Sequence, residues 1–371
     1  MRVRWPFALI TIATLLGCSA SPRQKYGLEP AAPFLFARDH TPTPCERQNQ
    51  TGAWLVALDS NRPAHNVLRT DHLAISRAEL PVFSMRLGPS LLEVIGEPVD
   101  SYSVQVCAEA GAATESDARS LLNEVKLTRD DKMISLSMPK FVQERPSNAF
   151  VQVQAPREAP ITINCDYAAM RVIGMKALVH LSTTHARITL LDTTGDVDAK
   201  AAEFGVIDFS GDRGNVRLDS ASDINLNFTG QKFDGSLDAK AGHPVRVLLP
   251  PGFASAFEAI VRHKTDFICR ADICDRVSSH KRDGKFVFTF GSGHPALHFI
   301  SQDGPVVIDS TDRLPVINKL QVSPCCGLIS FERNRSDAAA RRVRGPGGPS
   351  ATCLLFDTCR AEIYRRQRNS C

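Results

Sequence analysis

The chain has 371 residues and a nearly balanced charge, with 44 lysine and arginine residues against 40 aspartate and glutamate residues. This length accommodates one elongated domain or two compact ones. Residues 333–371 carry nine arginines against three acidic residues, so the rest of the chain is slightly acidic and lacks the basic footprint of a nucleic-acid-binding protein. The tail over residues 323–371 is predicted to be solvated and partly disordered, with binding to anionic lipid or sugar as the less favoured alternative.

The first seventeen residues have the order of parts of a signal peptide. Arg2 and Arg4 precede an apolar run over residues 5–16, and small residues follow it. A charged start, a short apolar middle and a small-residue end are typical of an export signal that is removed. A helix that spans a bilayer needs roughly 20 apolar residues, which is more than this run supplies. A retained membrane anchor is therefore less favoured than cleavage.

The end of this signal resembles a lipobox, with the sequence Leu15-Leu16-Gly17-Cys18. The resemblance implies that the chain is cut before Cys18 and that the thiol of Cys18 takes a diacylglycerol, which holds the protein on a membrane. Ser19 is not the aspartate that resembles an inner-membrane retention signal, and this favours the outer membrane. Cleavage near Ala20, which would give a soluble periplasmic protein, is the alternative.

Two segments separate the signal from the main body. Residues 18–44 are predicted to be a flexible tether, because residues 21–44 contain five prolines and mixed polarity. Residues 45–100 are predicted to form N-terminal strands, with candidates at residues 52–58 and 72–75. We expect these strands to cap the open end of the body that follows.

Four glycines recur at nearly constant spacing in the middle of the chain, namely Gly174, Gly195, Gly214 and Gly235. Polar and apolar residues alternate after the last three of them, as half-buried strands require. Two short strands in each period of about 20 residues predict an all-β fold, a β-solenoid over residues 101–322 built as a single-stranded, β-helix-like stack of rungs.

Residues 80–310 resemble bacterial cell-envelope proteins with β-strand repeats, a family of unknown function whose members are often described as candidate adhesins. The resemblance rests on the turns Thr194-Gly195-Asp196-Val197 and Ser210-Gly211-Asp212. Residues 244–253 are similar to a terminal strand, residues 304–308 to the last rung, and residues 101–138 to a small N-terminal α/β segment with a strand, a helix and another strand. The resemblance implies a β-solenoid in the envelope and no catalytic residues.

Eleven cysteines are many for a cytosolic chain and ordinary for an exported one. If Cys18 is lipidated, ten remain, and an even number permits full pairing. Cys269 and Cys274 flank four residues, a spacing that can close a small turn, and this is the disulfide that we predict. A second close pair of cysteines or histidines does not accompany them, so a zinc site is a weak alternative. We predict neither a metal nor another cofactor.

Familiar catalytic motifs are missing from the sequence. It contains no Gly-x-Ser-x-Gly elbow, phosphate-binding loop or His-Glu-x-x-His helix. His294 and His298 are four residues apart, but the glycines and proline around them argue against a helical metal pair. His180 and His185 fall on a predicted strand and its turn. All four are interpreted as surface or packing histidines.

Clustered aspartates leave one enzymatic alternative open, because some β-helix proteins cleave acidic polysaccharides with carboxylates and calcium on one face. The aspartates in question are Asp192, Asp196, Asp198, Asp208, Asp212, Asp219, Asp223 and Asp238. Asp196 and Asp212 occupy predicted turns, where aspartate is preferred for its own backbone hydrogen bonds. A polysaccharide lyase or hydrolase, or an incidental calcium site, is therefore less favoured.

The sequence as a whole favours a non-enzymatic, adhesin-like protein of the bacterial cell envelope. We expect lipid on Cys18 to attach the protein to a membrane, and we favour the outer membrane. The protein would face the periplasm or the cell surface. A β-solenoid would then present its strand faces to an envelope protein or a glycan. A sensing or regulatory partner in the envelope-stress response is the second alternative.

Overall fold

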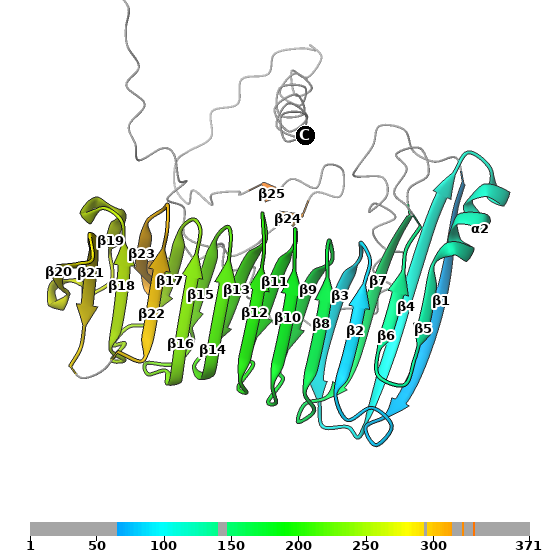
Figure 1. Cartoon of the computed structure of the whole chain (residues 1–371), viewed down its shortest axis with the longest axis horizontal. Helices are drawn as coiled ribbons and strands as arrows, with labels where there is room; N and C mark the ends of the chain where they lie inside the picture. Colours follow the sequence, from blue (N-terminus) through cyan, green and yellow to red (C-terminus); the bar gives the residue numbers. More distant parts are fainter. Residues whose placement is uncertain (1–64, 140–146, 293–294, 314–320, 323–328, 331–371) are drawn as a thin grey trace, which may run out of the picture. The chain divides into compact units, whose positions relative to one another are not determined.

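A computed structural model describes residues 65–139, 147–292, 295–313, 321–322 and 329–330 (Figure 1). The chain separates into two units. The strands of the first unit form two large sheets, and the described part of the second contains the antiparallel pair β24 (Gln321–Val322) and β25 (Ile329–Ser330). The all-β class predicted from the sequence is confirmed.

The first sheet has eleven strands and the second has twelve. In spatial order the first sheet contains β1 (His65–Ser76), β4 (Ser101–Ala112), β7 (Ser147–Pro156), β3 (Leu91–Glu97), β9 (Ala169–Ile173), β11 (Arg187–Leu191), β13 (Val206–Gly211), β15 (Ile224–Phe228), β17 (Val245–Leu249), β23 (Val306–Ser310) and β19 (Phe267–Cys269). The second sheet contains β20 (Ser278–Arg282), β21 (Lys285–Phe290), β18 (Phe257–Val261), β22 (Leu297–Ser301), β16 (Asp234–Ala241), β14 (Arg213–Ser220), β12 (Val197–Ala201), β10 (Val179–Thr183), β8 (Ile161–Cys165), β2 (Phe83–Leu87), β6 (Ile134–Ser137) and β5 (Lys126–Arg129).

From β8 to β17 the chain alternates between the two sheets, and each strand from β8 to β15 pairs in parallel with the strand two places further along. We call two successive strands, one in each sheet, a rung. In the second sheet Val179 lies opposite Val197, which lies opposite Val216. Residues at the same position of successive rungs therefore lie side by side, and the interval between them along the chain is nearly constant.

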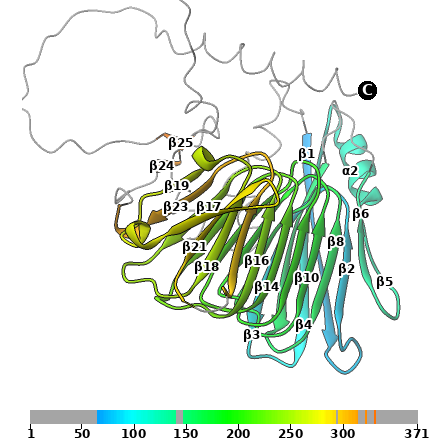
Figure 2. The same cartoon turned by 60° about the vertical axis from the view of Figure 1, so that its left-hand side comes forward.

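The hydrophobic core lies between the two sheets, which face each other as layers in Figure 2. Each central strand alternates, with one set of side chains in this core, as for Val197 and Ala199 in β12. Towards the later rungs the core becomes aromatic, and Phe228 lies 5.3 Å from Phe253 and 6.3 Å from Phe299 between ring centroids. Burial of this continuous core requires several rungs together, because one rung covers only part of its apolar surface.

The N-terminal strands belong to the same two sheets. β2 pairs with β8 and β3 pairs with β9, both in parallel. After β4 comes helix α2 (Glu115–Glu124), which packs on β4 and β1. The hydroxyl of Thr114 caps this helix by accepting a hydrogen bond from the backbone N–H of Asp117 at 3.1 Å. Short 3-10 turns lie at Lys264–Asp266, Cys274–Arg276 and Thr311–Arg313.

The order in which the strands stack changes after β17. β18 to β21 come next in the chain, but β22 and β23 then stack directly on β16 and β17. β18 and β19 pair with the far edges of β22 and β23 (Figure 1). The sequence predictions of a terminal strand at residues 244–253 and a last rung at residues 304–308 are therefore wrong. β17 lies between β15 and β23, and β23 lies between β17 and β19, because the inserted segment carries β18 and β19, which extend the two sheets beyond β22 and β23.

Candidate binding surface

Glycines of the sequence repeat stack where the chain enters the second sheet. Gly214 and Gly235 are paired, with φ angles of +114° and +125°. A Cβ atom on Gly214 would lie 2.6 Å from the carbonyl oxygen of Gly195, and one on Gly235 would collide with the carbonyl oxygen of Gly214. A backbone oxygen cannot move aside as a flexible side chain can, so the close stacking of these turns requires glycine.

The two turn aspartates of the enzymatic alternative interact with neighbouring side chains. Asp196 accepts a hydrogen bond from Asn215 Nδ2 at 2.9 Å, and Asn215 Oδ1 accepts one from Ser236 at 3.1 Å. Asp212 lies 3.2 Å from the guanidinium of Arg213. Among the described residues, no group of three or more histidine, cysteine, aspartate or glutamate side chains is arranged to hold a metal ion.

A third aspartate, Asp208, belongs to a polar row on the side of the first sheet away from the core. It is fully buried, and it accepts hydrogen bonds from Arg187 Nη1 and Asn225 Nδ2, both at 2.7 Å. Arg246 extends the row with a hydrogen bond to Asn225 Oδ1 at 3.3 Å. Burial raises the pKa of Asp208 above its usual range, although Arg187 and Asn225 act in the opposite direction. These contacts give Asp208 a structural role.

Charges of opposite sign alternate across the outer face of the second sheet. Asp198 lies opposite Arg217, which lies opposite Asp238. The neighbouring row has the same alternation, with Lys200, Asp219 and Lys240. On the next strand His180 Nδ1 lies 3.3 Å from Asp198 Oδ2. In-register stacking would otherwise bring like charges together, and opposite charges on neighbouring strands are favourable by about 0.2–1 kcal/mol a pair.

Three aromatic rings form a column on the turns where the chain leaves the second sheet. Tyr167 follows β8, His185 follows β10 and Phe204 follows β12. The rings of Tyr167 and His185 are stacked, with centroids 4.5 Å apart and planes 7° apart, and the ring of Phe204 lies 6.3 Å from that of His185. His185 Nε2 pairs with the carboxylate of Glu203. Tyr167 is 56% exposed and Phe204 is 78% exposed, so the column presents a hydrophobic surface to solvent.

The surface next to Glu203 has a depression of about 300 Å³. Its lining comes from the ends of β12, β14, β16 and β22 and their turns, and consists of Lys200, Ala201, Ala202, Glu203, Asp219, Ser220, Ala221, Gly242 and Gln302. The lining contains positively and negatively charged side chains and one side-chain amide among small residues. Such a depression offers hydrogen-bond donors and acceptors to a small polar ligand.

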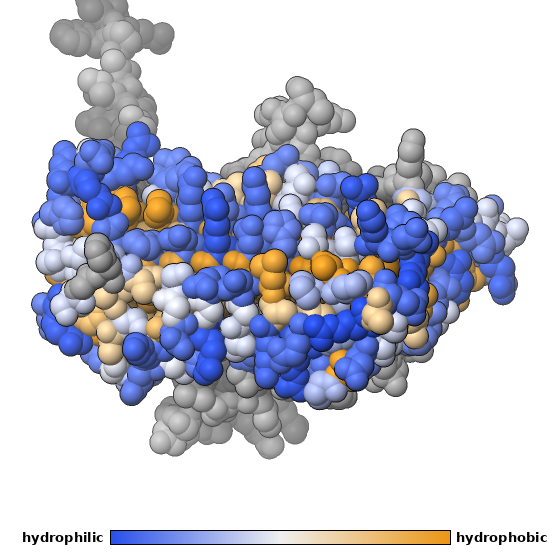
Figure 3. Space-filling view, turned by 60° about the horizontal axis from the view of Figure 1, so that its bottom comes forward, coloured by the Kyte–Doolittle hydropathy of each residue, from blue (hydrophilic) through white to orange (hydrophobic). Residues whose placement is uncertain are grey.

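The opposite row of turns, where the chain enters the second sheet, has a different character. Figure 3 shows a narrow line of hydrophobic residues that crosses this edge between hydrophilic ones. Leu178, in the turn before β10, is 49% exposed, and Val82, before β2, is 45% exposed. These are aliphatic side chains, and the described aromatic column lies at the other edge.

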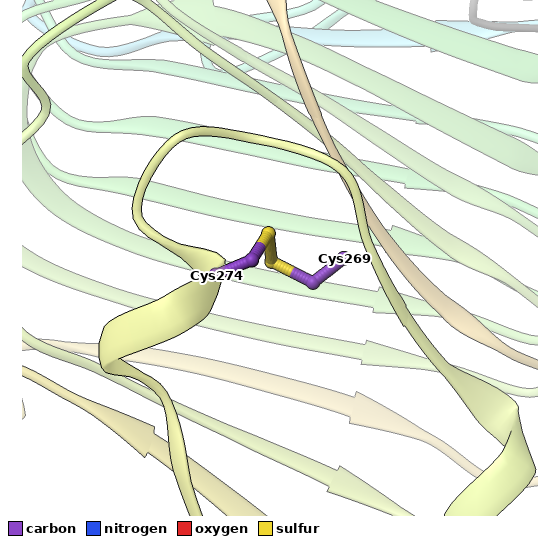
Figure 4. The surroundings of a disulfide bond; sticks show 2 residues. All are labelled: Cys269 and Cys274. Atoms are coloured by element: carbon purple, nitrogen blue, oxygen red, sulfur yellow. A yellow bond between two sulfur atoms is a disulfide. The ribbon is translucent and has the colours of Figure 1, made fainter.

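The cysteines of the described residues are mostly paired. A disulfide joins Cys269 and Cys274, the pair that the spacing predicts (Figure 4). Cys107 is also disulfide-bonded. Cys165 is a free, buried thiol, and burial raises its pKa.

Several sequence predictions fall outside the described residues. They are the signal peptide, the tether, the strand predicted at residues 52–58, Cys18, His294 and, apart from residues 329–330, the arginine-containing tail. Within the described part of the chain, no helix is long and apolar enough to cross a membrane.

Sequence reasoning singled out His180, His185 and the aspartates but missed Tyr167 and Phe204. The signal for Tyr167 is its spacing from His185. Tyr167 precedes His185 by the interval that separates paired positions such as Ile161 and Val179. The interval between the next paired positions, Val179 and Val197, leads from His185 to Glu203, so Phe204 lies one residue beyond the repeat. An alignment of the turns by this period would have placed Tyr167 and His185 in one column but not Phe204.

No family model and no curated protein sequence matches the chain. Similar solved structures include a candidate cell adhesion protein from Clostridium sporogenes, which is 10% identical with a TM-score of 0.25, over 66% of this chain and 99% of that one. A candidate adhesin from Bacteroides fragilis is 9% identical with a TM-score of 0.30, over 67% of this chain and 97% of that one. A candidate adhesin from Parabacteroides merdae is 9% identical with a TM-score of 0.24, over 66% and 96%.

Proposed function

We propose that this chain is a non-enzymatic binding protein of the bacterial cell envelope with an adhesin-like role. The observation that carries the proposal is the exposed column of Tyr167, His185 and Phe204 beside a polar depression. Large hydrophobic side chains that stay exposed on a rigid scaffold are characteristic of interaction sites. The partner engages this edge of the stacked turns.

The scaffold is a β-solenoid in this proposal, and the two sheets are its faces. Regular alternation between sheets supports this, as does the parallel pairing of each strand with the one two places on. The alternating charges of the outer face keep the second sheet hydrated while the turns remain available for binding. In a stack of this kind, groups on neighbouring turns that contact a ligand are separated by the spacing of the strands, about 4.7–4.9 Å.

The attachment to the envelope is through lipid on Cys18 after removal of residues 1–17. The order of charged, apolar and small residues before Cys18 supports this part of the proposal. Residues 18–44 then serve as the tether that holds the binding scaffold away from the membrane. The outer membrane is the favoured location.

A binding role is favoured over catalysis by the state of the aspartates. Asp208 is buried against Arg187, and Asp196 and Asp212 interact with neighbouring side chains. A carboxylate that acts on a polysaccharide has to reach the substrate, and these hydrogen bonds hold each group in another contact.

Two measurements test the proposal. Protein expressed with its native leader is extracted from membranes with detergent, and its intact mass is measured; we expect a chain that starts at Cys18 and carries acyl groups. A soluble chain that starts near Ser21 would contradict the anchor. Immobilised protein is then tested for retention of labelled envelope fragments, which we expect from the wild type and to a lesser degree from Phe204→Ala.

A third measurement addresses catalysis. The protein is incubated with polygalacturonate and calcium, and new sugar ends are counted. We expect none above background. Release that is lost in Asp196→Asn would show an enzyme and overturn the binding role.

A further inference from the structure

We propose that residues 45–64 of this chain lie on the side of the first sheet away from the core, and that a disulfide between Cys45 and Cys107 holds them there. We call this side of the sheet the outer face of the first sheet. Residues 45–64 lie outside the described residues. The proposal goes beyond the proposed function and does not depend on lipid at Cys18, since cleavage near Ala20 would also leave Cys45 in the mature chain.

The outer face of the first sheet is buried. Leu191 is 1% exposed, although it lies outside the hydrophobic core, to which β11 contributes Ile188 and Leu190. Phe150 in β7 is another such residue, at 8%. The second sheet differs, because the side chain of His180, on the outer face of the same rung as Leu191, is 43% exposed. Large side chains on an open sheet face keep contact with water, so another part of the molecule covers the first sheet here.

Among the described residues, no helix or strand packs on this face. The contacts of the described elements join neighbouring strands, the two sheets to each other, or α2 to β4 and β1. α2 lies on the core side, because its Leu121 and Leu122 belong to the hydrophobic core. The burial is that of a single chain, so the covering residues belong to the same chain and lie outside its described part.

A disulfide at Cys107 links the outer face to a segment outside the described residues. Cys107 lies on this face in β4, beside Phe150 in β7, and it is buried and disulfide-bonded. Cys269 and Cys274 pair with each other, and Cys165 is a free thiol. The partner of Cys107 is therefore one of the cysteines outside the described residues, which are Cys18, Cys45, Cys325, Cys326, Cys353, Cys359 and Cys371.

Chain length favours Cys45 as this partner. Cys45 precedes His65, the first residue of β1, by 20 residues, and such a segment reaches about 66–72 Å when extended. A path from β4 to β11 and back to β1 crosses nine strand spacings, about 43 Å. The further distance along β1, from Thr70 opposite Cys107 to His65, is about 17 Å. The segment between Cys45 and β1 is therefore long enough to cover the outer face as far as β11 and to return.

Cys325 and Cys326 are less suited to this pairing. Cys325 follows Arg313, the end of the 3-10 turn after β23, by 12 residues, which reach about 40–43 Å when extended. β23 lies eight strand spacings from β4, about 38 Å. Such a disulfide would need almost full extension of the segment and would leave no further residues to cover the outer face.

Charge argues against the cysteines of the arginine-containing tail. Residues 333–371 carry nine arginines against three acidic residues, whereas residues 45–64 carry two charges of each sign. The charges of the outer face are already paired with each other, as Arg187 is with Asp208 at 2.7 Å. Such a face has no surplus of negative charge for a basic segment, and burial of unpaired arginines would be costly. A neutral segment with an apolar run at residues 53–58 fits this face better.

Formation of the disulfide is an oxidation. The thiols of Cys45 and Cys107 give up two protons and two electrons, and their sulfur atoms form one bond. The protons and electrons pass to the disulfide of a thiol–disulfide oxidoreductase, which becomes a dithiol. Exported chains meet such oxidants outside the cytosol. The disulfide would also fix the end of the tether at residues 18–44 beside β4.

The disulfide is tested on the full chain, expressed with its native leader and digested with trypsin without reduction. Cleavage after lysine and arginine gives peptides 39–47 and 87–119, in which Cys45 and Cys107 are the only cysteines. We expect mass spectrometry to find these two peptides as one linked species that reduction separates. A reduced Cys107, or Cys107 linked to a peptide with another cysteine, would overturn the proposal.

The cover is tested by the rate of alkylation with N-ethylmaleimide. Thr189→Cys and Ser182→Cys each place a thiol in the same rung, on the outer face of the first and of the second sheet respectively. We expect Thr189→Cys to react at least tenfold more slowly than Ser182→Cys. Addition of Cys45→Ser should speed the reaction of Thr189→Cys at least fivefold and leave that of Ser182→Cys within twofold. Peptides 188–200 and 177–187 report the two thiols, because neither contains a natural cysteine.

Two results of the alkylation experiment would overturn the proposal. Equal rates for Thr189→Cys and Ser182→Cys would show that the outer face of the first sheet is open. A rate for Thr189→Cys that Cys45→Ser leaves unchanged would show that another part of the chain covers this face. Far-UV circular dichroism checks that each variant is folded, and the peptide map of the wild type needs no variant.

Discussion

Replacement of Gly214 by alanine tests whether close contact between turns holds the rungs together. At φ +114° an L-residue is strained, and such strain costs on the order of 1–3 kcal/mol. The new Cβ would also lie 2.6 Å from the carbonyl oxygen of Gly195. Overpacking of this kind adds about 1–3 kcal/mol. We expect Gly214→Ala to lower the free energy of unfolding by about 3–5 kcal/mol, a large part of a typical domain's stability.

Gly284 is the matched control for the backbone strain. It lies in the turn between β20 and β21 with φ +78°, and a Cβ there would have nothing within 4 Å. Gly284→Ala should therefore cost only the left-handed backbone term, about 1–2 kcal/mol. Urea unfolding followed by far-UV circular dichroism gives both free energies by linear extrapolation. If Gly214→Ala were no more destabilising than Gly284→Ala, close stacking of the turns would not be what requires glycine.

Four further predictions concern buried groups and the disulfide. Arg187→Ala leaves the carboxylate of Asp208 buried without its cation, and we expect a loss of about 3 kcal/mol at pH 7 in urea unfolding. This loss should become smaller as the pH is lowered, because burial raises the pKa of Asp208 and a protonated carboxyl needs no cation. Burial raises the pKa of Asp208 above 3.8 in the folded chain. The contribution of Asp208 to stability therefore falls as pH rises from about 4 through the folded pKa and is level above it. Asp208→Asn should remove this fall, and an unchanged pH profile of the free energy of unfolding would refute the assignment. Cys274→Ser opens the small loop to Cys269, which should cost about 2 kcal/mol from chain entropy, and thermal melts of the variant and the wild type compare it. The buried thiol of Cys165 should react with iodoacetamide only in denaturant, so mass spectrometry that finds it labelled in the native protein would contradict its burial.

The regular part of the fold was predictable because the same physical requirement recurs in every rung. A turn that contacts its neighbour closely needs glycine, and a strand with one face in the core needs alternating residues. Gly195, Gly214 and Gly235 are visible in the sequence as the residues that close contact between turns requires. The prediction of strands at this period follows from them without knowledge of distant contacts.

The order of the later strands was not predictable in the same way. β18 and β22 both carry alternating apolar residues, and either would satisfy the pattern that stacks on β16. Which of them occupies that position depends on the partners of both edges, and these are contacts between residues far apart in the chain, such as Leu237 with Leu297. Local periodicity does not contain this information.

The candidate site was missed for a related reason. Tyr167, His185 and Phe204 are chemically different residues in turns of different sequence, so no motif links them. Only the stacking of successive rungs brings them together. Cys18 is the opposite case, since its predicted role depends on adjacent residues alone and remains a prediction.

The alternating charges on the second sheet limit which internal duplications of rungs preserve the stability of the protein. An exact copy of one rung, inserted next to its parent, would place Asp198 beside an identical aspartate and Lys200 beside an identical lysine. Both pairs repel, so a tandem duplication of one rung begins with a stability penalty. A duplication of two rungs preserves the alternation, because Asp198 and Arg217 would be copied together. Lengthening of this protein by recombination is therefore expected to proceed in even numbers of rungs.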